Sequence, residues 1–446
     1  MTLRLHISFF FASAFLLASV CFARSVDTTT GKTNSSSSVT ESAHARKRLA
    51  HHRHRRAAVH GAKAKRRTSS THRAHATASA KAASVKPASV KTASLKTASV
   101  KSARTHKRTR RHHYVERFTA SSYATDITEG DVTDGEDPVV RQAAIDALGN
   151  MNGTVVAINP TDGRILAMVN QKLALSGGAE PCSTIKIAVA LAALSEGVIT
   201  KETPVQLGRH SQLTLTEALA HSNNAYFEAV GRRLGFERVS YYAHQFGLGE
   251  LAGYHIPGEH LGEFPSHVLP EKLGGVGRMC SFGESISMTP LQLGALVSAI
   301  ANGGTLYYLQ HPTSPEEVVN FQPRVKRHLQ IGDLVPEISP GMMGAVEYGT
   351  ARSLRLNFSE EQILGKTGTC SQNGTRFGWF ASYANTQYGR IVTVIFLEGG
   401  RPTYGPKAAE ISGRFYRALY DHNFFAQPAT AASRSGERSS AVGAEQ

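Results

Sequence analysis

Residues 181–194 read PCSTIKIAVALAAL. Alanine and leucine favour a helix over this stretch, the proline suits its start, and Gly197 marks its end. Ser183 is therefore expected at a helix N-terminus, with Lys186 one turn further along the same face. A serine hydroxyl needs a neighbouring base to become a nucleophile, and a desolvated, neutral lysine can be that base. The stretch predicts a serine nucleophile paired with a lysine.

A structural interpretation explains the same residues. Ser183 would cap a buried, alanine-rich helix, and Lys186 would extend its amine to solvent. Because patterns of four residues recur by chance, Ser-x-x-Lys alone favours this interpretation. Two later motifs change the balance.

The net charge of +16 belongs mainly to one segment of the 446 residues. Residues 24–113 hold 23 Lys and Arg against 2 Asp and Glu. The segment is rich in Ser, Thr, Ala and His, and from Lys86 it repeats a five-residue unit of the KPASV type. Because it offers little apolar surface, we expect it to be disordered. It would bind an anionic membrane or wall polymer, or act as a solvated tether.

The first 23 residues predict export. They begin MTLR and continue into an apolar run, with Ala23 as the small residue before a cleavage site. The chain is then expected at the periplasmic or extracellular face of the cytoplasmic membrane. Two alternatives are an uncleaved anchor over residues 6–23 and a lipoprotein acylated at Cys21. Export argues against nucleic acid as a partner of the basic segment.

Beyond that segment the cysteines are Cys182, Cys280 and Cys370. One disulfide with one thiol and three buried thiols explain this odd number equally well. No His and Asn arrangement accompanies a cysteine, so a catalytic thiol is not favoured. No histidines, cysteines or carboxylates stand at metal-ligand spacing, so we expect neither a metal nor a cofactor.

Hydrophobic periodicity and turn residues predict the main elements of the folded part. A Pro-Asp-Gly turn separates the first two strands, which form a hairpin, and the last three strands follow one another as a sheet. The predicted strands cover residues 154–159, 164–169, 363–370, 377–383 and 391–397. The predicted helices cover residues 138–148, 290–302 and 407–420, and two more helical pieces lie within residues 213–234.

The second motif interrupts those two helical pieces at residues 221–224, HSNN. Alternate residues of a short extended loop point the same way, so the Ser222 hydroxyl and the Asn224 amide would face one cleft. An ordinary Ser/Asn turn explains these letters as well, and by itself it is the preferred explanation.

The third motif is Lys366-Thr367-Gly368-Thr369, in the first of the three C-terminal strands. Lys366, Thr367 and Thr369 offer a cation and hydroxyls for a carboxylate, and Gly368 would let a ligand's backbone approach closely. A surface turn is the alternative.

Together the three motifs resemble the active-site set of the serine penicillin-recognising proteins, which includes penicillin-binding proteins and β-lactamases. Ser183 begins the one Ser-x-x-Lys in the chain, and Lys366 begins the one Lys-Thr-Gly. The segments AINPTDGRILAM from residue 157, SMTPLQL from residue 287 and AIANGG from residue 299 resemble transpeptidase domains of high-molecular-mass penicillin-binding proteins. The resemblance covers residues 138–421.

The resemblance implies an α+β domain over residues 114–427, with a disordered tail over residues 428–446. An antiparallel five-stranded sheet is flanked by helices, and the cleft lies where a helical lobe meets the sheet. The implied activity is a D,D-transpeptidase or D,D-carboxypeptidase that acts on D-Ala-D-Ala stem peptides of peptidoglycan through a serine acyl-enzyme. β-Lactam antibiotics would mimic the substrate.

Family roles are implied for the individual residues. Ser183 would be the nucleophile and Lys186 its base, kept neutral by burial and by Lys366. Ser222 would relay a proton, Asn224 would hold the peptide amide, and Lys366, Thr367 and Thr369 would bind the terminal carboxylate. The backbone N–H groups of Ser183 and Thr369 would form the oxyanion hole.

Two residues depart from the family pattern. Cys182 stands where glycine is usual, and Glu284 stands where a Gln-Gly pair is common. Two other functions stay open: a β-lactamase with fast deacylation, and a noncatalytic β-lactam-sensing or wall-binding protein. The TPLQ segment favours a transpeptidase over a β-lactamase.

Overall fold

The computed structural model describes residues 117–386 and 389–426. The predicted signal segment, the basic segment and the C-terminal tail lie outside these ranges, so the predictions made for them stay predictions. Within the described ranges, none of the helices combines the length and the apolar character needed to cross a bilayer.

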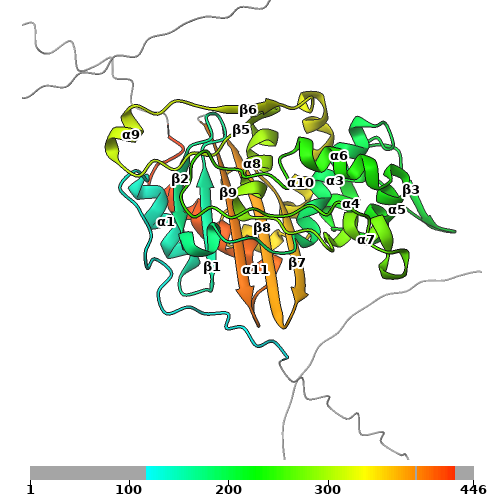
Figure 1. Cartoon of the computed structure of the whole chain (residues 1–446), viewed down its shortest axis with the longest axis horizontal. Coiled ribbons are helices and arrows are strands. Elements are labelled where there is room, and N and C mark those ends of the chain that lie inside the picture. Colours follow the sequence, from blue (N-terminus) through cyan, green and yellow to red (C-terminus); the bar gives the residue numbers. More distant parts are fainter. Residues whose placement is uncertain (1–116, 387–388, 427–446) are drawn as a thin grey trace, which may run out of the picture. The chain divides into compact units, whose positions relative to one another are not determined.

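The domain is built on a five-stranded antiparallel sheet with strand order β2-β1-β9-β8-β7 (Figure 1). This confirms the predicted sheet. Two smaller pairs, β3-β4 and β5-β6, accompany it. The strands are β1 (Gly153–Ile158), β2 (Ile165–Val169), β3 (Val205–Gly208), β4 (Ser211–Leu213), β5 (Thr305–Tyr307), β6 (Val325–His328), β7 (Ile363–Gln372), β8 (Thr375–Thr386) and β9 (Gly389–Gly399).

The helices begin at residues suited to capping. Asp137 caps α1, and Thr214 with Glu217 and Thr289 with Gln292 form capping boxes for α4 and α8. The α-helices are α1 (Pro138–Leu148), α2 (Gln171–Ala174), α3 (Lys186–Ser195), α4 (Leu215–Ala220), α5 (Asn224–Leu234), α6 (Phe236–Gln245), α7 (Gly275–Phe282), α8 (Pro290–Ala301), α9 (Pro315–Val319), α10 (Val335–Glu347) and α11 (Gly405–Asp421). The 3-10 helices are η1 (Cys182–Ile185), η2 (Glu271–Leu273), η3 (Gly332–Leu334) and η4 (Arg352–Leu356).

Helices cover both faces of the large sheet. Successive residues of a strand point to opposite faces, so Val155 belongs to the core shared with α1 and α11, whereas Val156 belongs to the core shared with α8. β1 is buried along its whole length because both of its faces are covered. This explains why it reads as a continuous run of apolar and small residues rather than as an alternating pattern.

A helical lobe adjoins the β7 edge of the sheet. It is built mainly from α3 to α7, with α10 packed against both α4 and β7. The short helix η1, which precedes α3, lies directly against β7. The Ser-x-x-Lys segment therefore lies where the lobe meets the sheet.

Candidate active site

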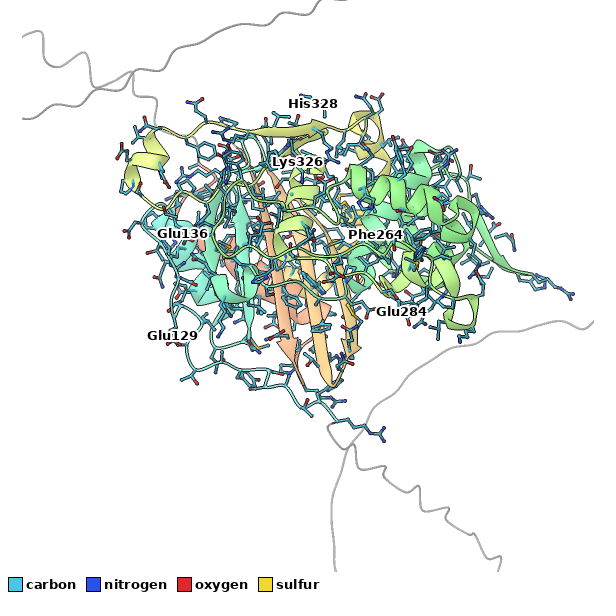
Figure 2. The ribbon with its side chains drawn as sticks, viewed as in Figure 1. Glu129, Glu136, Phe264, Glu284, Lys326 and His328 are labelled. Atoms are coloured by element: carbon cyan, nitrogen blue, oxygen red, sulfur yellow. A yellow bond between two sulfur atoms is a disulfide. The ribbon has the colours of Figure 1, made fainter. Side chains whose placement is uncertain are left out.

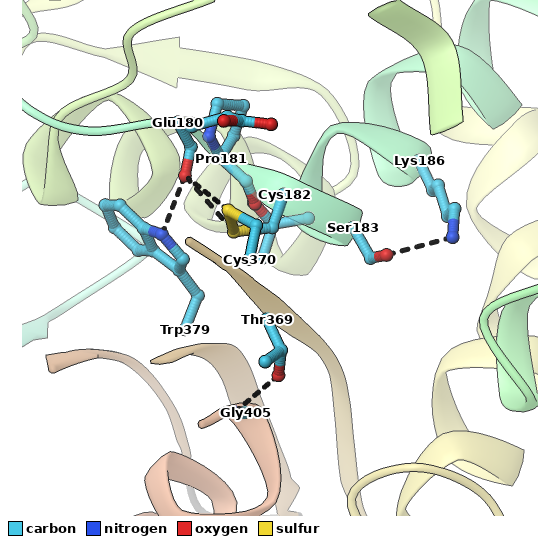
Figure 3. Close-up of a disulfide and its surroundings, with 10 residues drawn as sticks. Glu180, Pro181, Cys182, Ser183, Lys186, Thr369, Cys370, Trp379 and Gly405 are labelled. Atoms are coloured by element: carbon cyan, nitrogen blue, oxygen red, sulfur yellow. Dashed lines mark hydrogen bonds between the residues drawn. A yellow bond between two sulfur atoms is a disulfide. The ribbon is translucent and has the colours of Figure 1, made fainter. Parts of the chain in front are cut away.

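Ser183 and Lys186 lie on the first turns of the helical segment that begins at Cys182. This segment enters as the 3-10 helix η1 before α3 begins at Lys186. Residues three apart align along a 3-10 helix, and Lys186 Nζ lies 2.9 Å from Ser183 Oγ (Figure 3). The Lys186 side chain is fully buried, whereas Ser183 is half-buried. The structural interpretation, in which the amine extends to solvent, does not hold.

The loop between α4 and α5 brings two more groups to the same amine. Lys186 Nζ lies 3.1 Å from Ser222 Oγ, 2.8 Å from Ser222 O and 2.6 Å from Asn224 Oδ1. The expected extended loop is wrong, because Ser222 is left-handed with φ 55° and Asn224 is already the first residue of α5. The Asn223 side chain caps that helix by accepting a bond from Tyr226 N.

These contacts orient the lone pair of a neutral lysine. Two of the neighbours, Ser222 O and Asn224 Oδ1, are carbonyl oxygens that can only accept hydrogen bonds. A neutral amine has two N–H groups, and these carbonyls use both of them. The lone pair of Nζ is then left for a hydroxyl proton, and Ser183 and Ser222 supply the nearby hydroxyls.

The environment of Lys186 makes it a base at neutral pH. Burial, followed by the positive charge of Lys366, lowers the pKa of Lys186 from 10.5 to about 6. Both causes are those that the family resemblance implied. Glu228 opposes them more weakly. At pH 7 the amine is therefore mostly unprotonated.

Lys366 lies fully buried on β7, opposite Ala381 of β8. Its ammonium donates a hydrogen bond to Thr367 O at 3.1 Å. Burial lowers the pKa of Lys366 from 10.5 to about 7, so its charge at neutral pH depends on what binds beside it. A carboxylate placed there would favour the protonated form.

The two threonines of the third motif differ in their surroundings. Thr367 is buried, and its Oγ1 lies 2.7 Å from Thr350 Oγ1. Thr369 is exposed, and its Oγ1 accepts a bond from Gly405 N at 2.8 Å, which leaves its own O–H free to donate. A hollow of about 640 Å³ adjoins Thr350 and is also lined by His221, Tyr348 and Arg352.

Gly368 has a close neighbour that was not predicted from the sequence. A side chain at this position would come 2.9 Å from Pro181 O and 3.2 Å from Thr184 Cγ2. Glycine at this position therefore permits the close approach of the segment that carries Ser183. This glycine lets η1 pack against β7.

A disulfide joins the two motif segments. Cys182 and Cys370 are bonded with a Cα–Cα distance of 5.5 Å (Figure 3). Cys280 is a buried free thiol. Of the two alternatives left open by the sequence, one disulfide with one thiol is the arrangement found. Within the described ranges, no group of three or more His, Cys, Asp and Glu side chains could hold a metal ion.

Sequence reasoning missed two residues beside the site. Thr350 follows α10 and carries no motif of its own. Glu180 lies three residues before Ser183, and burial together with Glu284 raises its pKa to about 7, although Arg278 opposes the shift. Glu284, one of the two departures from the family pattern, accepts a bond from Arg278 Nε at 2.7 Å. The contacts of Thr350 and Glu180 form only in the folded chain, so neither residue could be identified from the sequence.

Comparison with protein-family models matches residues 153–420 to the family Transpeptidase, described as "Penicillin binding protein transpeptidase domain". Stage V sporulation protein D of Bacillus subtilis is 30% identical over 260 residues, which cover 49% of this chain and 39% of that protein. Peptidoglycan D,D-transpeptidase MrdA of Acinetobacter baumannii is 23% identical over 343 residues, which cover 59% of this chain and 50% of that protein. The chain spans half the length of these curated relatives or less.

Solved structures show the same fold. The crystal structure of Pseudomonas aeruginosa PBP2 in complex with WCK 5153 matches with a TM-score of 0.54 and 24% identity, covering 65% of this chain and 77% of that chain. The D,D-transpeptidase domain of a peptidoglycan glycosyltransferase from Eggerthella lenta matches with a TM-score of 0.52 and 19% identity, covering 65% of this chain and 82% of that chain.

Proposed function

The chain belongs to the penicillin-binding protein transpeptidase family, and on this premise we propose that it is a D,D-transpeptidase or D,D-carboxypeptidase of peptidoglycan synthesis. Its substrate would be a stem peptide that ends in D-alanyl-D-alanine. One observation carries the proposal: Lys186 Nζ lies within 3.1 Å of Ser183 Oγ, Ser222 Oγ and Asn224 Oδ1. A buried, neutral amine so placed can activate a hydroxyl and pass on its proton.

Acylation would proceed as follows. Ser183 Oγ attacks the carbonyl carbon of the penultimate D-alanine while its proton moves to Lys186 Nζ. The resulting tetrahedral oxyanion would accept hydrogen bonds from the backbone N–H groups of Ser183 and Thr369, each worth about 3 kcal/mol. Lys186 then passes the proton through the Ser222 hydroxyl to the leaving nitrogen. The C–N bond breaks, D-alanine leaves, and the peptide stays esterified to Ser183.

Substrate binding would use the other residues of the three motifs. Lys366, Thr367 and Thr369 would hold the terminal carboxylate, and Asn224 would hold an amide of the stem peptide. Gly368 would contribute by keeping the Ser183 segment close to this strand. Transfer of the acyl group to an amine of a neighbouring stem gives a crosslink, and transfer to water gives carboxypeptidase activity.

The proposal places the domain outside the cytoplasm, because its substrate is part of the cell wall. The predicted signal segment agrees with this location, either cleaved or kept as an anchor. The basic segment would then hold the domain near an anionic membrane or wall polymer.

A fluorescent penicillin tests the proposal directly. We expect the full chain to form a covalent adduct that survives denaturation, and we expect Ser183→Ala to form none. Ser211→Ala, which removes an exposed serine on β4, should label like the unmodified chain. Mass spectrometry of a peptic digest should place the adduct on Ser183.

The lifetime of the adduct separates the alternatives. A label stable for many minutes, together with D-alanine release from a D-Ala-D-Ala peptide, supports the proposal. A stable label without D-alanine release would indicate a β-lactam sensor. Rapid loss of the label with hydrolysed penicillin would indicate a β-lactamase, and no label would overturn acyl-enzyme chemistry altogether.

A further inference from the structure

The disulfide Cys182–Cys370 joins the residue before Ser183 to the residue after Thr369. Ser183 and Thr369 are the two residues whose backbone N–H groups form the oxyanion hole in the proposed function, on which this inference rests. Each N–H is therefore one residue away from the same covalent bridge. No other pair of positions in the described part of the chain joins the two motif segments by a disulfide.

The disulfide lies beside the carbonyl oxygen of Glu180, which also accepts a hydrogen bond from the sheet (Figure 3). Trp379 Nε1, on β8, donates a hydrogen bond to Glu180 O at 3.0 Å. The sulfur atoms of Cys182 and Cys370 lie 3.4 Å and 3.7 Å from the same carbonyl oxygen. Because a disulfide sulfur carries no proton, the indole supplies the hydrogen bond, and the disulfide supplies the covalent link to β7.

The backbone at Cys182 needs such support. Cys182 has φ 52°, in the left-handed region that L-residues other than glycine seldom adopt. The conformation of Cys182 sets the direction in which the peptide N–H of Ser183 points. Without a constraint, a side chain at position 182 would favour a right-handed or extended backbone and would turn that N–H away from its present direction.

We propose that the Cys182–Cys370 disulfide is a positioning device for the oxyanion hole. It holds Cys182 in its left-handed conformation and thereby fixes the N–H of Ser183 relative to the N–H of Thr369. Opening the bridge slows acylation more than it weakens the initial binding of a β-lactam. This is because the oxyanion forms only during the reaction, whereas the ground state uses the carboxylate contacts.

The rival explanation is plain stabilisation. The two cysteines are 188 residues apart in sequence, and a bridge closing so long a loop restricts the unfolded chain whatever it does in the site. A loss of thermal stability is expected under both explanations and cannot separate them. A comparison of glycine with serine at position 182 can separate the two explanations, because glycine adopts positive φ without strain.

The test compares two double variants of the full chain, Cys182→Ser/Cys370→Ser and Cys182→Gly/Cys370→Ser, with the unmodified chain. Both variants remove the bridge, but only glycine relieves the strain at position 182. The rate of acylation by fluorescent penicillin is measured against penicillin concentration, which gives the limiting rate constant and the binding constant separately. Thermal unfolding is recorded for each protein, and rates are compared below the lowest transition.

We expect Cys182→Ser/Cys370→Ser to lose about tenfold or more in the limiting acylation rate, with the penicillin binding constant changed by less than about threefold. Cys182→Gly/Cys370→Ser should recover most of that rate, although its melting temperature also falls below that of the unmodified chain. Equal limiting rates in the two variants overturn the positioning role and leave stabilisation. If Cys182→Ser/Cys370→Ser does not fold, the glycine variant is compared with the unmodified chain alone. A limiting acylation rate about tenfold below that of the unmodified chain then overturns the proposal as well.

Reduction of the unmodified chain gives an independent reading. Two thiols of dithiothreitol supply two electrons and two protons, so that Cys182 and Cys370 become thiols and the reagent becomes a cyclic disulfide. The acylation rate should fall on reduction and return on reoxidation. Alkylation of the native oxidised chain at both Cys182 and Cys370 overturns the inference. If the oxidised chain forms no adduct with fluorescent penicillin, the proposed function is overturned instead.

Discussion

Two clusters of buried charged side chains differ in how their charge is compensated. Arg141 pairs with Asp131 at 2.9 Å and with Glu136 at 2.8 Å, and His311 Nε2 lies 2.9 Å from Glu136. Figure 2 labels Glu136, which lies at the α1 side of the domain. At the candidate active site the hydrogen-bond partners found for Lys186 and Lys366 are hydroxyl and carbonyl oxygens, and Lys186 Nζ also lies 5.6 Å from the centre of the Phe227 ring. Neither lysine forms an ion pair within the described residues.

The difference sets the protonation state of each cluster. A buried ion is tolerated where an opposite charge offsets its lost hydration, which is the arrangement around Arg141. A buried lysine without such a partner releases its proton instead. An unfolded lysine keeps its proton up to pH 10.5, whereas folded Lys186 loses it above about 6. Between these values the unfolded chain binds more protons, so Lys186 lowers stability increasingly as the pH falls from 10.5 towards 6.

Replacing the reactive amine should have the largest effect on activity. We expect Lys186→Met to lower the acylation rate by penicillin about a thousandfold, because no base remains for the Ser183 proton. The melting temperature should stay equal or rise, since a buried amine is exchanged for an apolar chain of similar length. Stopped-flow labelling and calorimetry measure the two effects. A variant that keeps a tenth of the rate would show that Lys186 is not the base.

Replacing the paired carboxylate should have the opposite signature. Glu136→Ala leaves Arg141 with one carboxylate and removes the acceptor of Met168 N and His311 Nε2. We expect the free energy of unfolding to fall by about 3 kcal/mol, while the acylation rate of the folded protein stays within twofold. Glu129→Ala, at a nearby exposed glutamate, is the control and should change neither. A slow but stable Glu136→Ala would mean that the clusters are coupled.

The pH dependence of acylation should report the unpaired lysines. The second-order rate constant of acylation, which reports the free enzyme, should rise about tenfold per pH unit below pH 6 as Lys186 loses its proton, and it should fall above pH 7 as Lys366 loses the charge that holds the carboxylate. Because the lysines repel each other, the two apparent pKa values belong to the pair. Lys366→Arg stays protonated and should remove the falling limb. A rate that still rises at pH 9 would contradict the lowered pKa values.

Much of the fold could be predicted because local signals agreed with the tertiary structure. The helix predicted over residues 138–148 is α1, and the capping box at Thr214 and Glu217 is present. Strand edges were less exact: β8 extends to Thr375 and Thr386, beyond the predicted residues 377–383. A strand ends where its partner ends, and the partner is not written in the local sequence.

The candidate site could be predicted only in part. Spacing along one helix is enough to bring Ser183 near Lys186, and the structure gives 2.9 Å. The sequence predicts an extended loop at Ser222, but the structure has a left-handed residue there. This conformation brings the Ser222 hydroxyl to the Lys186 amine. The pairing of Cys182 with Cys370 depends on the packing of η1 against β7, and three cysteines far apart in sequence give no indication of it.

The smallest expected effect concerns a neutral contact that supports the site. Thr350 Oγ1 lies 2.7 Å from the buried Thr367 Oγ1, and one such hydrogen bond is worth about 1 kcal/mol, or about fivefold in rate. Thr350→Val should therefore slow acylation about fivefold, whereas Thr350→Ser, which keeps the hydroxyl, should acylate nearly like the unmodified chain. Equal rates in both variants would mean that the pairing of β7 with β8 positions Thr367 by itself. The Thr350 hydroxyl would then contribute little to the site.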